Sequence, residues 1–106
     1  MRIGLVINPI AGMGGRVGLK GTDGKVDEAR DRGAEPRAPE RAARMLDRLS
    51  TLALDTELLT AIEPMGAALA RDAGFEPTVA YFPAGAETTA DDTAAAIEEF
   101  ITGAVD

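Results

Sequence analysis

The sequence predicts an α/β protein of three layers, in which helices flank a mainly parallel sheet. Three short apolar segments alternate with segments whose apolar residues recur at helical spacing. Such alternation is typical of βαβ units around a parallel sheet. The chain has 106 residues, of which 45% are hydrophobic, enough for one domain with a modest core.

The first predicted strand covers residues 3–7. This nearly continuous apolar run fits a strand that is covered on both faces, and it ends at Asn8 and Pro9 because proline cannot donate to a strand ladder. Residues 10–24 contain six of the twelve glycines in the chain. A loop of this length indicates either a functional role or mobility. A short helix is predicted over residues 25–32.

Pro39 suits the first turn of a second helix, which we expect to end near Leu52. Its apolar side consists of residues at helical spacing: Ala42, Met45, Leu46 and Leu49. Three arginines of this helix are expected to form a solvated face with ion pairs to neighbouring acids. These residues are Arg41, Arg44 and Arg48, beside Glu40 and Asp47.

The remaining elements follow from local patterns. Alternation over residues 54–60 predicts a second strand, residues 64–74 a helix, and residues 78–82 a third strand. Thr89 is the expected N-cap of a last helix, with Asp92 completing a capping box. The predicted apolar side of that helix contains Ala94, Ile97, Phe100 and Ile101. Residues 104–106 resemble the approach to a further strand, so the sheet is expected to be incomplete.

Composition excludes several functional classes. The sequence contains no cysteine and no histidine, which excludes disulfides, thiol or histidine catalysis and the usual zinc sites in this chain. The net charge of −7 argues against binding to nucleic acid or to an anionic membrane. No apolar run approaches the roughly 18 residues of a membrane span. No signal-peptide pattern is visible, so we expect a cytoplasmic protein.

The glycines from Gly12 to Gly18 suggest a loop that binds phosphate, because glycine lets backbone N–H groups approach phosphate oxygens. Two standard motifs nevertheless fail on spacing. The dinucleotide fingerprint needs glycine where Val17 stands, and the Walker A pattern needs Ser or Thr directly after lysine, whereas Gly21 follows Lys20. A flexible surface loop is an equally good interpretation of this composition. Lys20 alone is more typical of a solvated charge, and Asp23 of a turn.

Residues 87–92 contain three acids and two hydroxyl groups, which could hold a hard cation through oxygen ligands. A helix cap with acids in the first turn explains the same residues, and we favour it. No nucleophile can be paired with a base. The sequence therefore predicts no catalytic residue and no metal ligand.

One stretch carries a family resemblance. Residues 3–24, IGLVINPIAGMGGRVGLKGTDG, closely resemble the start of the ATP-NAD kinase family, specifically the prokaryotic branch that includes the X-type proteins of acetoin operons. Residues 87–93 resemble the segment before the next strand of that branch. Weaker similarity at residues 41–43 and 64–66 keeps the chain aligned with the family between these two stretches, so the resemblance covers the whole chain.

The resemblance implies an N-terminal α/β domain related to NAD, diacylglycerol and sphingosine kinases. It also implies ATP and NAD as ligands, Mg²⁺, and transfer of the ATP γ-phosphoryl group to a hydroxyl group. Asn8 and Pro9 would lie near the nucleotide phosphates. The loop and the resemblance together predict eight nucleotide-contacting residues: Asn8, Pro9, Gly12, Gly14, Gly15, Lys20, Thr22 and Asp23.

The sequence departs from the family in one respect. The family's Gly-Gly-Asp-Gly-Thr catalytic motif and its C-terminal NAD-binding domain do not occur within residues 1–106. We therefore expect residues 1–106 to form a single partial N-terminal domain that is inactive alone. Two alternatives remain: a stand-alone, non-catalytic nucleotide-binding module, and half of a split kinase that folds against a separate catalytic chain. A homo-oligomer is a further candidate assembly.

Overall fold

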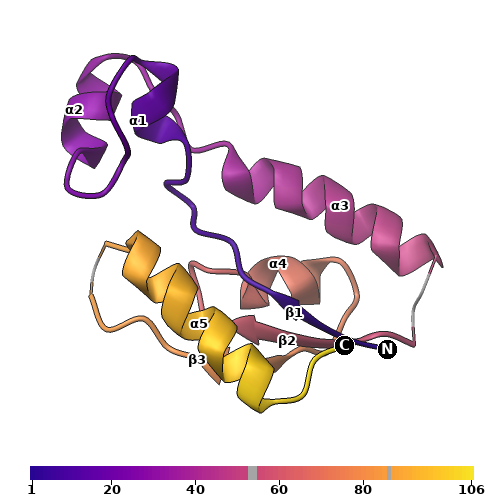
Figure 1. Cartoon of the computed structure of the whole chain (residues 1–106). Coiled ribbons are helices and arrows are strands. Elements are labelled where there is room, and N and C mark those ends of the chain that lie inside the picture. The colour runs from indigo at the N-terminus through magenta and orange to yellow at the C-terminus, as the bar shows by residue number, and fades with distance from the viewer. Residues whose placement is uncertain (53–54, 86) are drawn as a thin grey trace.

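The computed structural model describes residues 1–52, 55–85 and 87–106 (Figure 1). Three strands form one parallel sheet in the order β1-β2-β3. They are β1 (Arg2–Leu5), β2 (Glu57–Ala61) and β3 (Thr78–Tyr81). The predicted α/β class with a parallel sheet is confirmed, and β2 is its central strand.

Helices cover both faces of this sheet. α3 (Ala38–Leu52) and α4 (Ala67–Asp72) pack on one face, and α5 (Ala90–Thr102) packs on the other. Neighbouring residues of β2 show the division, because successive side chains of a strand point to opposite faces. Leu58 belongs to the cluster that contains Leu46 of α3, whereas Leu59 belongs to the cluster that contains Phe100 of α5.

The central strand differs from its predicted form. Alternation predicted this strand over residues 54–60, of which Leu54 lies outside the described residues. The observed strand begins at Glu57, and residues 58–61 are all buried. Consecutive side chains are buried because helices cover the strand on both faces.

The glycine-rich segment is folded into helices. It contains α1 (Met13–Arg16), where the sequence predicted a loop, and it leads into the predicted α2 (Val26–Asp31). This segment lies apart from the sheet (Figure 1) and has a small core of its own: Ile10, Met13, Val26, Ala29 and Ala34. Met13 is fully buried there. The apolar side chains among the glycines therefore specify a packed unit.

Two other helices depart from prediction in detail. α4 begins at Ala67, not at residue 64, because Gly66 precedes it with a φ of 143° that few other residues adopt. In α5, Phe100 is buried as expected, but Ile97 is 46% and Ile101 69% exposed. The small Ala96 is buried in their place. α5 crosses the sheet closely at Gly4, where a β-carbon would lie 2.5 Å from the Phe100 ring.

The end of the chain lies against the beginning of β1. The backbone N–H of Asp106 donates to the carbonyl of Arg2 at 2.9 Å, and the N–H of Arg2 donates to Asp106 Oδ2 at 2.7 Å. Met1 accepts a hydrogen bond from Glu57 of β2, so Arg2 faces the opposite edge of the strand. Residues 104–106 thus run beside the outer edge of β1.

Two adjacent glycines of α1 provide a matched test of this packing. A β-carbon on Gly14 would overlap the carbonyl oxygen of Gly21, whereas one on Gly15 would meet nothing within 4 Å. We expect Gly14→Ala to lower the free energy of unfolding by about 1–3 kcal/mol through overpacking. Gly15→Ala should change it by less than about 1 kcal/mol, towards higher stability. Urea unfolding measures both, and equal values for the two variants would contradict the packed arrangement.

Candidate functional site

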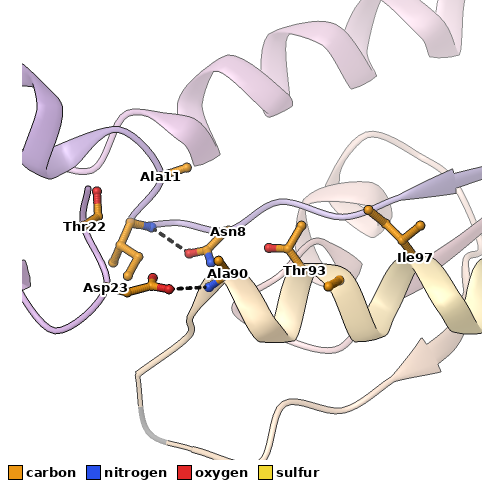
Figure 2. Close-up of a pocket in the computed structure, with 9 residues that line it drawn as sticks. Asn8, Ala11, Thr22, Asp23, Ala90, Thr93 and Ile97 are labelled. Atoms are coloured by element: carbon orange, nitrogen blue, oxygen red, sulfur yellow. Dashed lines mark hydrogen bonds between the residues drawn. The ribbon is translucent and has the colours of Figure 1, made fainter. Parts of the chain in front are cut away.

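A cleft of about 420 Å³ opens where β1 ends. Three segments line it: the residues directly after β1, the end of the glycine-rich segment, and the first turns of α5 (Figure 2). The lining residues are Asn8, Ile10, Ala11, Thr22, Asp23, Ala90, Thr93, Ala94 and Ile97. Carboxyl ends of parallel strands are the usual binding edge of open α/β sheets, which makes this cleft the candidate site.

Asn8 joins two of these segments through its carboxamide. Asn8 Nδ2 donates to the carbonyl of Thr89 at 2.9 Å. Asn8 Oδ1 accepts from Thr88 Oγ1 at 2.8 Å and from the N–H of Ile10 at 3.3 Å. Thr88 is almost fully buried. Both the donor and the acceptor atom of the carboxamide are therefore used, and they tie the end of β1 to the segment before α5.

Asp23 connects the glycine-rich segment to the same helix. The N–H of Ala90, the first residue of α5, donates to Asp23 Oδ2 at 2.9 Å (Figure 2). A carboxylate at this end of a helix satisfies a free N–H and interacts favourably with the helix dipole. Asp23 also lies in a turn, as predicted, because the N–H of Lys25 donates to the carbonyl of Thr22 at 2.9 Å. Its side chain in addition caps a helix from a distant part of the chain.

Thr89 and Asp92 form the predicted capping box of α5. The N–H of Thr89 donates to Asp92 Oδ2 at 2.9 Å, and the hydroxyl of Tyr81 donates to Asp92 Oδ1 at 2.7 Å. No group of three acidic side chains suited to a metal occurs among the described residues. The helix-cap interpretation of residues 87–92 is therefore the one that the hydrogen bonds support.

The glycine-rich segment uses several of its own N–H groups internally. The N–H of Gly14 donates to Thr22 Oγ1 at 3.1 Å, and the carbonyl of Gly14 accepts from the N–H of Leu19 at 2.8 Å. Gly14 is buried, whereas Gly15 and Lys20 are exposed. The role of Gly14 in this structure is close packing inside the segment.

The eight predicted contact residues are thus divided by the fold. Asn8, Thr22 and Asp23 line the cleft together. Pro9 borders a smaller hollow beside Thr88, and Gly12 borders a cleft on the α3 side. Gly14, Gly15 and Lys20 line none of these three sites. Sequence reasoning missed the apolar wall from α5, although its helical spacing was visible.

Charge is distributed unevenly along the chain. Residues 1–44 contain nine of the eleven basic residues and six of the eighteen acidic ones. That part therefore carries a net charge of +3, and residues 45–106 carry −10. The glycine-rich segment, α2 and the start of α3 all belong to the basic part. None of these basic residues lines the cleft, whose one charged lining residue among those described is Asp23.

Comparisons with protein-family models, with curated proteins and with solved structures found no match. The likeness to ATP-NAD kinases therefore depends on the residues quoted above. In the described part of the chain, no helix combines the length and apolar character that crossing a membrane requires.

The hydrogen bond between Tyr81 and Asp92 can be tested by titration. The pKa of Tyr81 is raised above its ordinary value of 10.0. The largest cause is this hydrogen bond, and desolvation and the negative charge of Asp92 add to it. Tyr81 is the only tyrosine, and tryptophan is absent, so ultraviolet absorbance follows this group alone. We expect the pKa of Tyr81 to fall towards 10.0 in Asp92→Asn. An unchanged titration midpoint in that variant, with its fold verified by circular dichroism, would contradict the contact.

The same shift has a consequence for stability. The folded state holds the Tyr81 proton more tightly than the unfolded state does. Protonation of Tyr81 therefore stabilises the folded state, and this contribution is complete below pH 10.0. This contribution disappears as the pH rises through the raised pKa of Tyr81. Urea unfolding of the wild type should therefore show a steeper loss of stability above pH 10.0 than unfolding of Asp92→Asn.

Asn8→Asp tests the junction between β1 and α5. The change keeps the shape of the side chain but places a carboxylate oxygen beside the carbonyl of Thr89, where Nδ2 now donates. We expect the free energy of unfolding to fall by about 1–3 kcal/mol at neutral pH. The deficit should shrink in acid, because a protonated carboxyl group can again donate. A variant as stable as the wild type at neutral pH would contradict the role of Asn8.

Proposed function

We propose that this chain binds a nucleotide in the cleft at the end of β1, as the N-terminal domain of an ATP-NAD kinase-like protein. ATP and NAD are the proposed ligands. The observation that carries the proposal is the position of the cleft: it lies at the carboxyl end of a parallel strand, with Asn8 at its base. Open α/β sheets bind their ligands at this edge.

The lining of the cleft fits the parts of such a ligand. Ile10, Ala11, Ala94 and Ile97 provide an apolar wall for a flat ring, and Asn8, Thr22 and Asp23 add polar groups. The volume of about 420 Å³ lies within the usual range for small-molecule sites.

The proposal is limited to binding. Phosphoryl transfer depends on positioning and on charge neutralisation around the phosphates, and the described residues bring no nucleophile and base together. Asp23 is the one carboxylate among the described lining residues. Mg²⁺ is commonly held by one or two carboxylates together with substrate phosphates, so Asp23 is the residue that would hold it here.

Calorimetric titration with ATP and with NAD tests the proposal on the purified chain. We expect a dissociation constant of about 1 mM or tighter for at least one of them. Ala94→Phe fills the cleft from α5 and should weaken binding at least about tenfold, a change of roughly 1.4 kcal/mol. Glu99→Phe places the same ring on the same helix outside the cleft and should leave binding unchanged. Absence of heat with both ligands, or equal losses in the two variants, would contradict the proposal.

A further inference from the structure

Exposed apolar side chains concentrate on two helices that lie on opposite faces of the sheet. Six large apolar residues are exposed in the described part of the chain. Four of them occupy these helices: Met45 and Leu52 on α3, and Ile97 and Ile101 on α5. Grouped apolar exposure of this kind marks interaction surfaces more often than isolated side chains do.

On α5 the exposed residues form a continuous line. Ala90, Ala94, Ile97 and Ile101 follow one another at spacings of four, three and four residues, which places them on one side of a helix. We call these four residues the α5 stripe. Asp91 and Glu98 flank it, seven residues apart, and both are exposed. Within the described residues neither carboxylate has an ion-pair partner.

On α3 a second line has the same spacing but the opposite charge. Arg41, Met45, Arg48 and Leu52 also follow at four, three and four residues, and all four are exposed. We call them the α3 stripe. The expected ion pairs of its arginines with Glu40 and Asp47 do not form among the described residues. Their guanidinium groups are thus available to another molecule.

The two stripes complement each other. Arg41 and Arg48 are separated by seven residues, as are Asp91 and Glu98, and this spacing corresponds to about 10.5 Å along a helix. Two arginines of one helix can therefore meet two carboxylates of another in register. In the parallel arrangement that we propose, Asp91 lies opposite Arg41 and Glu98 lies opposite Arg48. Packing α5 against another α5 would instead bring acids together, because that helix contains Asp91, Asp92, Glu98 and Glu99 and no basic residue.

We propose that, in the absence of nucleotide, the α5 stripe of one copy of this chain docks on the α3 stripe of a second copy. Ala90, Ala94 and Ile97 of the α5 stripe also line the cleft, so this docking and nucleotide binding exclude each other. α3 and α5 lie on opposite faces of the sheet, so one molecule cannot pair its own stripes. Each copy therefore offers a free α3 on one side and a free α5 on the other. Contacts of this head-to-tail type continue into rings or open chains, and the assembly grows beyond a dimer.

Sedimentation of the nucleotide-free chain at physiological salt tests this interface. We expect the average mass to increase with concentration past that of a dimer. Glu98→Arg and Arg48→Glu, each alone, place like charges across the interface and should weaken association roughly fivefold. Both positions are exposed, so the fold should persist, which circular dichroism verifies. Glu99→Arg is the matched control: it makes the same charge change on α5 outside the stripe and should have little effect.

Mixing the two charge variants gives the sharpest result. In an equal mixture, the arginine introduced at position 98 of one copy faces the glutamate introduced at position 48 of the other. At the opposite contact, the native Glu98 faces the native Arg48, so association should recover to near the wild-type value. Three results would each overturn the proposal: a wild type that stays monomeric at every concentration, equal effects of Glu98→Arg and Glu99→Arg, or no recovery in the mixture.

Discussion

The hydrogen bonds of the Asn8 carboxamide are the interaction on which the candidate site depends. They connect the end of β1 to Thr88 and Thr89, which are about eighty positions away in the sequence. β1 lies at the edge of the sheet. The residues after β1 and the first turns of α5 form two of the three walls of the cleft. The distance between these two walls therefore depends on the hydrogen bonds of Asn8.

The glycine-rich segment contributes in a different way from that suggested by its glycines. It is packed around its own small core, and Gly14 lies where only a residue without a side chain fits. The segment contributes Thr22 and Asp23 to the cleft. The carboxylate of Asp23 caps α5 by accepting a hydrogen bond from its first residue. Asn8 and Asp23 thus fix the beginning of α5 from two directions.

The sequence predicted what depends on neighbouring residues and missed what depends on distant ones. The capping box of Thr89 and Asp92, the extent of α3 and the parallel α/β class follow from local patterns, and the structure confirms them. The exposed side of α5 was predicted wrongly, because the burial of Phe100 is shared by Ala96 and not by Ile97 or Ile101, and helical spacing alone does not distinguish the two sides of Phe100. The link from Asp23 to Ala90 spans 67 positions, and no local pattern predicts it. α1 was missed because four residues with two glycines have low helix propensity.

The most direct test of this arrangement uses the amide protons of Asn8 in a nitrogen-resolved NMR spectrum. The chain contains no other asparagine and no glutamine, so the side-chain NH₂ signal identifies itself. With Asn8 Nδ2 bonded to the carbonyl of Thr89, one of the two protons should exchange slowly with water, and the group should be as rigid as the backbone of β1. Two protons that both exchange rapidly, on a carboxamide that rotates freely, would contradict the account.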